Sequence, residues 1–381
     1  MSITMSICLS PGGSSIYRAD ALSGVLHVAT QDGVMELAEQ SDGSWRDTAR
    51  TLDGHHVVAL VRDPLRGELF AGTHDAGVFS SADGRQWRAC SEGLEIDNVF
   101  SLACAARGDE LRLYAGTEPA ALFESRDFGR RWRRLGALEQ ASGAETWMFP
   151  APPFLGHVKV ITIHPHNPDC IYVAVEQGGL YRSDDAGETW VELTAGMPND
   201  AHRVVLHPEN PDRLYLCNGF FFNRSDDGGR SWHELKDKTD KIGYADPLVF
   251  HPNKPDVMLV AGAFATPDTW VKGSANSSIA RTGDGGETWE YARGGLPAEI
   301  RPSIEAMCMQ AAGEQSRVFA GNTDGEVWMS ADEGQHWQCI VEGLPPVSKC
   351  FHADLIHGKI DLTDVRVPDE IRELMEQMVQ R

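Results

Sequence analysis

A short segment recurs along the chain and constrains its fold more than any other feature. Each copy reads Ser or Thr, any residue, Asp, any residue, Gly, two further residues and Trp. Five copies fit this pattern, and they begin at Ser125, Ser183, Ser225, Thr282 and Ser330. The copy SADGRQW at Ser81 is one residue shorter, and SDGSW at Ser41 is a degenerate seventh copy. Because seven of the ten tryptophans end such a segment, the chain is built from one unit repeated seven times.

Each copy has the composition of a tight turn between two β-strands. The runs before the turn, such as GLYRS and GVFSS, alternate apolar and polar residues as a half-buried strand does. The Asp and Ser oxygens can accept backbone N–H groups, and Gly supplies a positive φ. Upstream, the segments HPHNPD, HPENPD and HPNKPD indicate another hairpin. Two hairpins per repeat predict one four-stranded antiparallel sheet.

A four-stranded sheet cannot bury both of its faces alone, so the seven sheets must stack around an axis. The sequence therefore predicts an all-β fold, a seven-bladed β-propeller that occupies residues 1–346. Residues 347–381 are expected to close the ring and to end in an amphipathic helix that starts near Pro368. We expect this C-terminal helix to dock on the propeller or to join two copies of the chain in a homo-oligomer.

The repeated segments resemble the Asp-box (BNR) repeats of sialidases, xyloglucanases, sortilin-type receptors and propeller assembly factors of photosystem II. The resemblance covers about residues 14–345. It implies blades with Asp-box turns on the face away from the usual ligand site, which we call the bottom face. It is specific for the fold and much less specific for function, because propellers carry many functions.

Composition excludes several classes of partner. The chain has 34 Lys and Arg against 56 Asp and Glu, a formal charge of −22, which argues against binding nucleic acid or an anionic membrane surface. No apolar run approaches the roughly 20 residues that span a bilayer. The N-terminus has no cationic start typical of a signal peptide. The eight cysteines show no CxxC spacing, so we expect reduced thiols and a cytoplasmic protein.

Two long gaps between repeats indicate insertions, and strand alternation puts both on the top face. The first is Gly136–Gly156, with the segment ETWMFPAPPF, and the second is Phe264–Ser278, with TPDTW. These insertions carry the aromatic residues Trp147, Phe149, Phe154 and Trp270. They would either pack on each other as a plug or form a lid over an axial pocket.

A comparison of repeats predicts that several histidines meet at the top of the central channel. A gapless offset of 102 aligns His55 with His157 and His74 with Glu176. The HPxxPD turns put Tyr244 and Asp200 in the same register, and His202 lies two residues further along its strand. The set expected around the opening, including second-strand ends and the last crossing, is His55, His56, His157, His202, His352, His74, Glu118, Glu176 and Tyr244.

This set suggests an enzyme that acts on a small organic substrate. In one version, a divalent transition metal (Zn, Fe or Cu) is bound by His55, His56, His157, His202 and His352. In the other, no metal is needed and the acid–base groups are His55, His157, His202, Glu176 and Tyr244. The aromatic residues of the insertions, with His74 and Glu118, would contact the substrate.

Two other functions stay open from the sequence. A sialidase-like glycoside hydrolase needs an arginine triad, but only Arg203 and Arg301 are candidates on the top face, and nothing pairs Tyr244 with Glu305. A non-catalytic propeller could instead bind a protein partner through ETWMFPAPPF. The glycines of TGDGG and SDDGG are turn residues of the repeat and not phosphate loops.

Overall fold

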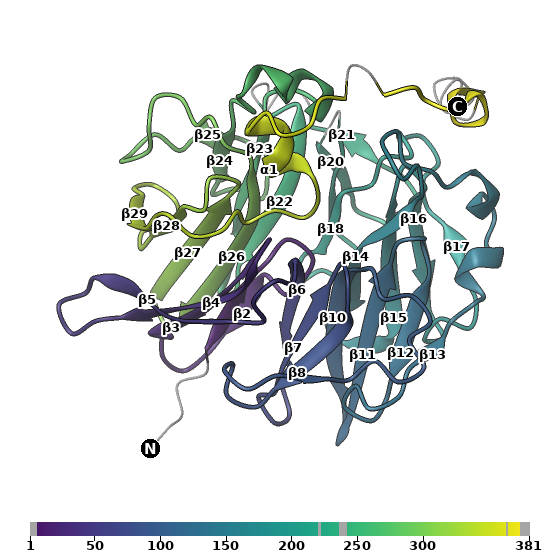
Figure 1. Cartoon of the computed structure of the whole chain (residues 1–381), viewed down its shortest axis with the longest axis horizontal. Coiled ribbons are helices and arrows are strands. Elements are labelled where there is room, and N and C mark those ends of the chain that lie inside the picture. Colours follow the sequence, from purple (N-terminus) through teal and green to yellow (C-terminus); the bar gives the residue numbers. More distant parts are fainter. Residues whose placement is uncertain (1–5, 220–221, 236–241, 363–364, 374–381) are drawn as a thin grey trace.

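Seven separate sheets stack side by side around a common axis in the computed structural model (Figure 1). The structure describes residues 6–219, 222–235, 242–362 and 365–373. The predicted seven-bladed β-propeller is confirmed, with one sheet for each copy of the repeat. Each blade starts near the axis and its strands follow one another outward.

The first four blades follow the repeats in order. Blade 1 contains β1 (Ile7–Leu9), β3 (Val25–Thr30), β4 (Gly33–Glu39) and β5 (Trp45–Thr51). Blade 2 contains β6 (Val57–Arg62), β7 (Leu69–Thr73), β8 (Gly77–Ser81) and β9 (Arg88–Ala89). Blade 3 contains β10 (Val99–Arg107), β11 (Glu110–Thr117), β12 (Leu122–Ser125) and β13 (Arg133–Arg134). Blade 4 contains β14 (His157–His164), β15 (Asn167–Glu176), β16 (Gly179–Ser183) and β17 (Val191–Glu192).

The last three blades complete the ring. Blade 5 contains β18 (Arg203–Leu206), β19 (Leu214–Cys217), β20 (Phe222–Ser225) and β21 (His233–Glu234). Blade 6 contains β22 (Tyr244–His251), β23 (Lys254–Ala263), β24 (Ser278–Thr282) and β25 (Glu290–Tyr291). Blade 7 contains β26 (Ile304–Ala312), β27 (Gln315–Asn322), β28 (Val327–Ser330) and β29 (Gln338–Val341), and the short N-terminal strand β2 (Ile16–Arg18) adds to it.

The hydrophobic cores lie between neighbouring blades. Phe70 of blade 2, for example, packs in one cluster with Leu113 and Phe123 of blade 3. Trp132, from an Asp-box turn, belongs to the same cluster. All four side chains are buried. Since each sheet buries its faces only against its neighbours, the blades depend on one another as the repeat predicts.

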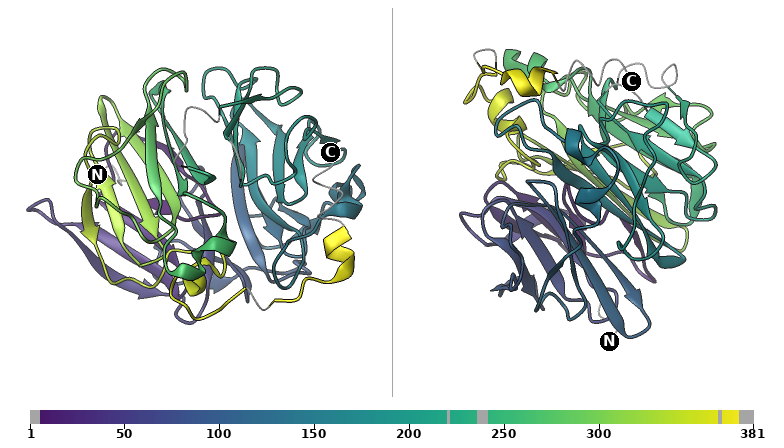
Figure 2. Two further views of the ribbon diagram at one scale, coloured as in Figure 1. Left: turned by 90° about the horizontal axis from the view of Figure 1, so that it is seen from above. Right: turned by 90° about the vertical axis from the view of Figure 1, so that its right-hand side faces the viewer.

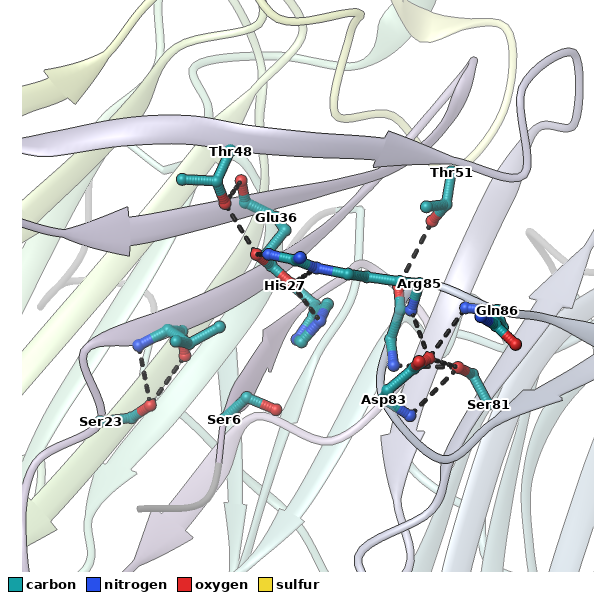
Figure 3. A network of polar contacts seen from close by, with 12 residues as sticks. Ser6, Ser23, His27, Glu36, Thr48, Thr51, Ser81, Asp83, Arg85 and Gln86 are labelled. Atoms are coloured by element: carbon teal, nitrogen blue, oxygen red, sulfur yellow. Dashed lines mark hydrogen bonds and ion pairs between the residues drawn. The ribbon is translucent and has the colours of Figure 1, made fainter. Parts of the chain in front are cut away.

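The Asp-box turns are held by the hydrogen bonds that their residue types predict. In blade 2, Oδ1 of Asp83 accepts the backbone N–H groups of Arg85 and Gln86, both at 2.8 Å, and lies 3.0 Å from Oγ of Ser81 (Figure 3). The Arg85 guanidinium also donates to Glu36 of blade 1 at 2.7 Å. In the later copies, backbone N–H groups are accepted in the same way by Asp127, Asp185, Asp227, Asp284 and Asp332. These aspartates therefore shape the turns.

An N-terminal segment fills the axis of the ring. β1 pairs in parallel with β3, and β2 pairs in parallel with β26. Between them, the backbone N–H of Gly12 donates to Val58 at 3.0 Å, and its carbonyl accepts from Leu102 at 2.9 Å. Arg203 donates to the carbonyl of Pro11. This segment therefore touches inner strands of several blades and occupies the channel below the top face.

This arrangement corrects the place expected for Gly12. At an offset of 43 residues, the comparison of repeats also aligns Gly12 with His55 and so predicts it at the start of the innermost strand of blade 1, but that strand is Ile7–Leu9. Because the chain enters blade 1 from the axis instead of from a preceding blade, the spacing of the other repeats does not apply to it. Gly12 lies against the strands of blades 2 and 3.

Both predicted insertions lie on the top face, together with the segment that follows blade 7. The first, between β13 and β14, contains η1 (Leu138–Gln140) and η2 (Ala144–Thr146). The second, between β23 and β24, contains η4 (Pro267–Lys272). After β29 the chain crosses back over the ring and forms α1 (His352–Ile356), which packs beside η4 (Figure 2).

The start of the predicted C-terminal helix is seen. Residues 369–373 are helical, and the backbone N–H of Arg372 donates to Pro368 at 3.0 Å. Most of the apolar face, from Leu374 to Val379, lies outside the described residues. Within the described residues, no helix is long and apolar enough to cross a lipid bilayer.

The axial segment predicts a measurable effect on stability. We expect Gly12→Ala to lower the free energy of unfolding by about 1–3 kcal/mol, because a Cβ there would collide with the carbonyl oxygen of Phe100. Gly136→Ala is the control, since a Cβ at that glycine has no neighbour within 4 Å. Urea unfolding followed by tryptophan fluorescence measures both. Equal stability of the two variants would contradict the close packing of this segment.

Candidate functional site

A β-bulge recurs near the top of the innermost strands. The strand pairing shifts by a residue or more at this point in five blades. The residues inside the bulges are Val58, Phe100, Lys159, Asp246 with Pro247, and Glu305. A bulge lets two successive side chains turn toward the same side of a sheet. The side chains of Lys159, Asp246 and Glu305 therefore lie around the axis, together with the side chains at the starts of the same strands, such as His157 and Tyr244.

Glu176 is the centre of a buried group of charged side chains. Its Oε1 lies 2.6 Å from Nζ of Lys159 and 3.2 Å from Nε2 of His202, and it accepts the hydroxyl of Tyr244 at 3.3 Å. Its Oε2 lies 2.8 Å from Nε2 of His157. Burial alone would raise the pKa of Glu176, but the attraction of Lys159 and His202 outweighs burial and holds the pKa well below its ordinary value. Glu176 is therefore ionised.

His157 is held between two carboxylates and two aromatic rings. Its Nδ1 lies 3.3 Å from Oε2 of Glu118, on the side opposite Glu176. The ring of Phe100 stacks on it with centroids 4.0 Å apart, and the ring of Phe149 lies 5.1 Å away. Burial opposes a charge on His157, but the bonds to Glu118 and Glu176 outweigh burial and raise its pKa. The geometry therefore favours an imidazolium.

The segment after blade 7 brings further titratable side chains into the site. We call residues 348–352 the strap. Lys349 of the strap pairs with Asp246, and Nδ1 of His352 lies 2.6 Å from Oε1 of Glu305. Burial, together with repulsion from Lys159, holds the pKa of Lys349 well below its ordinary value. The strap thus completes the site instead of only covering it.

Two histidines of blade 2 hold the strap by its backbone. Nε2 of His56 lies 2.7 Å from the carbonyl oxygen of Ser348, and Nε2 of His74 lies 2.7 Å from that of Lys349. Burial, with a further effect of the neighbouring His74, lowers the pKa of His56 to about 3, and burial also lowers the pKa of His74. Both rings are therefore neutral near pH 7.

A cavity of about 280 Å³ lies between the strap and blades 2 to 4 on the top face, and we call it the strap cavity. Asn98 donates to Glu118 in its wall at 3.0 Å and faces Nδ1 of His74 at 2.6 Å. The walls combine imidazole, carboxylate, amide and aromatic groups, contributed by Gln31, His56, His74, Asn98, Phe100, Glu118, Phe149, Pro152, Pro153, His157, Cys350, Phe351 and Asp354.

The structure does not bring His55 to this site. In blade 2 the first hairpin pairs Arg62 with Leu69, whereas in blade 4 it pairs Ile163 with Ile171, so the blade 2 turn is one residue shorter. This difference makes His56, and not His55, the counterpart of His157. Because side chains alternate along a strand, the shift turns His55 outward, where its Nδ1 lies 2.9 Å from Asp75 and its side chain is 31% exposed.

The four aromatic residues of the insertions do not all reach the site. Phe149 lines the strap cavity, and Trp270 is buried against the imidazole of the strap, with ring centroids 4.8 Å apart. Trp147 instead donates to the hydroxyl of Tyr181 at 2.9 Å, in the wall of blade 4. Phe154 is half-buried and is not part of the cavity wall.

Sequence comparison missed half of the charged groups. Lys159, Asp246, Glu305 and Lys349 were not among the predicted site residues, and Asp200 was seen only as a register position. The HPxxPD turns do carry a signal, because they align Lys159 with His202 and Asp246, two residues after the register of His157. Residues two apart on a regular strand face the same side, so strand alternation also predicts that Lys159 faces the same side as His157. The bulge and the strap, however, leave no pattern in the repeats.

One group of side chains could hold a metal ion. Among the described residues, only Glu176, Asp200 and His202 bring three ligand atoms within 4.8 Å of one another, and all three are buried. Nδ1 of His202 lies 2.9 Å from the carbonyl oxygen of Ala245, while Nε2 lies 3.0 Å from Oδ1 of Asp200. The five histidines predicted as ligands do not form such a group within the part of the chain that the structure describes.

Comparisons with known proteins agree with the repeat. Residues 178–293 match the family model described as sortilin, neurotensin receptor 3. This match covers part of the chain, with the Asp-box turns of blades 4 to 6. The fold is a β-propeller with Asp-box turns. No curated protein matches this propeller significantly.

Solved structures show the same fold. The propeller resembles the GH74 xyloglucanase from Xanthomonas campestris, with 18% identity and a TM-score of 0.63, over 88% of this chain and 55% of that one. It also resembles a GH74 enzyme from Niastella koreensis, with 15% identity and a TM-score of 0.60, again over 88% of this chain and 55% of the other. The Asp-box propeller thus spans about half the length of these enzymes, and the likeness concerns the fold.

The neutral histidines that hold the strap predict a dependence of stability on pH. The pKa of His56 is near 3 in the folded chain and about 6.5 in its ordinary state, so unfolding takes up a proton at any pH between these values. Stability from this group is complete above pH 6.5 and is lost as the pH falls toward 3. We expect His56→Gln, which keeps an N–H donor for Ser348, to unfold with a shallower pH dependence in chemical denaturation.

The control for this experiment is His166→Gln, at an exposed turn position. It should leave the pH profile of the free energy of unfolding unchanged. A profile for His56→Gln that coincides with the wild type over pH 3–6.5 would contradict a neutral His56 beneath the strap.

Proposed function

We propose that the chain is an enzyme and that the strap cavity is its active site for a small organic substrate. The observation that carries this proposal is the row of Glu118, His157 and Glu176, which joins the cavity to the buried charged group beneath it. Ionised side chains removed from water cost stability unless they are closely paired, so such a row is typical of a functional site. Its place at the top of a closed channel supports this assignment.

In this proposal, Glu118 is the catalytic base that faces the cavity. Its Oε1 accepts from Asn98 and its Oε2 faces Nδ1 of His157, so the carboxylate is held in one orientation toward the cavity. His157 is a positioning residue, because both of its nitrogens already face carboxylates. Cys350 also lines the cavity, but burial raises the pKa of its thiol, so the nucleophilic thiolate is disfavoured.

A divalent transition metal, Zn, Fe or Cu, is the second part of the proposal. Nδ1 of His202 lies 2.9 Å from the carbonyl oxygen of Ala245, so Nε2 is the nitrogen that would bind a metal together with the carboxylates of Glu176 and Asp200. A backbone carbonyl commonly fixes the tautomer of a histidine ligand in this way. A bound metal would supply a Lewis acid beneath the cavity.

A sialidase-like hydrolase is less well supported by the site. Arginines recognise the carboxylate of such sugars, but no arginine is among the residues that line the strap cavity. Arg203 donates to Pro11 at the axis, and Arg301 donates to the carbonyl of Gly273 at 2.7 Å. Both candidates are thus engaged elsewhere.

Metal analysis tests the ligand set. We expect protein produced without a His tag, and incubated with Zn²⁺ or Fe²⁺ before desalting, to retain about one equivalent of metal by plasma mass spectrometry. Asp200→Asn should retain at least tenfold less, because it replaces a buried carboxylate ligand. His55→Ala is the control and should retain the wild-type amount. A metal-free wild type would rule out this part of the proposal.

Substitution of Glu118 tests the proposed base. A panel of small metabolites is screened by thermal shift, and compounds that bind are then tested for turnover by mass spectrometry. We expect Glu118→Gln to lower turnover at least about 100-fold, the usual contribution of a general base. Glu92→Gln, at an exposed glutamate, is the control. Ligands bound without any turnover would instead support a binding propeller, including one with a protein partner at the top face.

A further inference from the structure

The charged groups in the wall of the strap cavity are acidic on balance. Glu118 and Asp354 line the cavity, whereas no lysine or arginine is among its lining residues. Below the wall, Glu176 adds a third carboxylate 2.8 Å from His157. A cavity of this kind repels an anionic molecule and attracts a cation, because charged groups at short range interact strongly.

The histidines in the wall do not reverse this balance. His56 and His74 are neutral, since burial lowers both pKa values. His157 carries a charge, but that charge lies between Glu118 and Glu176, so this trio has more negative than positive charge. Lys159 is a second cation behind Glu176, at 2.6 Å from Oε1 and outside the cavity wall.

Two lysines, Lys349 and Lys359, lie on other elements near the cavity, and neither is among its lining residues. In α1, Asp354 pairs with Lys359 at 3.0 Å, and the Lys359 side chain is 61% exposed, so this pair is solvated and weak. Lys349 belongs to the strap, but its side chain pairs with Asp246 in the buried group. The lining residues that the structure describes therefore include no lysine or arginine side chain.

Aromatic rings form the rest of the surface that a cation would meet. Phe100, Phe149 and Phe351 all line the cavity, and the centroids of Phe149 and Phe351 lie 6.2 Å apart. The face of an aromatic ring attracts a cation, and does so more strongly when water is excluded. Rings beside a carboxylate therefore suit an organic cation better than an inorganic ion.

We infer that the strap cavity binds a small organic cation, a protonated amine or a compact quaternary ammonium, with its charge toward Glu118 and its carbon atoms against the phenylalanine rings. This inference rests on the proposed function for the place of the site and adds the chemical class of its substrate. The net charge of −22 favours the same class, since it attracts cations toward the chain from a distance.

Ligands of equal size and different charge test the inference. Benzylamine, benzyl alcohol and benzoate, with tetramethylammonium as a compact cation, are titrated into the intact protein by calorimetry at pH 7 and constant ionic strength. We expect at least one of the two cations to bind at least tenfold more tightly than benzyl alcohol, and benzoate to bind least. Tighter binding of benzoate than of both cations, or no binding by either cation at millimolar concentration, would overturn the inference.

Variants then locate the binding. Glu118→Gln should weaken binding of the cation at least tenfold and leave benzyl alcohol almost unchanged, whereas the control Glu92→Gln should change neither. Unchanged cation binding in Glu118→Gln would overturn the inference. A cation that binds with the expected dependence in a protein that turns over no compound would refute only the enzymatic proposal. An anion that is turned over through Glu118 would refute only the substrate class.

Discussion

The top of this propeller depends on the pairing of buried charges around its axis. The single carboxylate of Glu176 contacts Lys159, His202 and His157, and all four side chains are buried. A buried ion pair gains little over an apolar pair, but an ion left without its partner is strongly destabilising. The positions of the inner strands, the bulges and the strap are therefore tied together, since a shift of any one of them would separate charges that have no water to replace their partners.

The segments outside the repeat supply what the blades lack. Seven similar sheets produce an open channel, and the repeat by itself says nothing of what fills it. Here the N-terminal residues bond to inner strands along the axis, and the strap brings Lys349 and His352 from above. The blades thus form a rigid frame, while the parts of the chain that differ from the repeat make the site specific.

The sequence predicted the frame well because turn chemistry and alternation are local. The spacing of the Asp-box turns predicted the seven blades and both insertions. The HPxxPD turns predicted the shared register of His157 and Tyr244. The misplacement of His55 came from one missing residue in a turn, which an alignment without gaps cannot show. The HPxxPD turns carried a signal for Lys159 that was not used, whereas Glu305 was missed because a bulge changes which side chains face the axis without changing the pattern of residues. The contacts of the strap are set by tertiary packing and have no local signal.

The pairing of β2 with β26 has a consequence for the order of assembly. Ile16 of β2 pairs with Met309 of β26, so β2 cannot form this pairing until almost all of the ring has been synthesised. Contacts between such distant parts of a chain form late, because closing a long loop costs entropy before any contact offsets it. Six blades are therefore synthesised before the seventh can be completed. Until β26 has been made, β2 has no partner strand in blade 7.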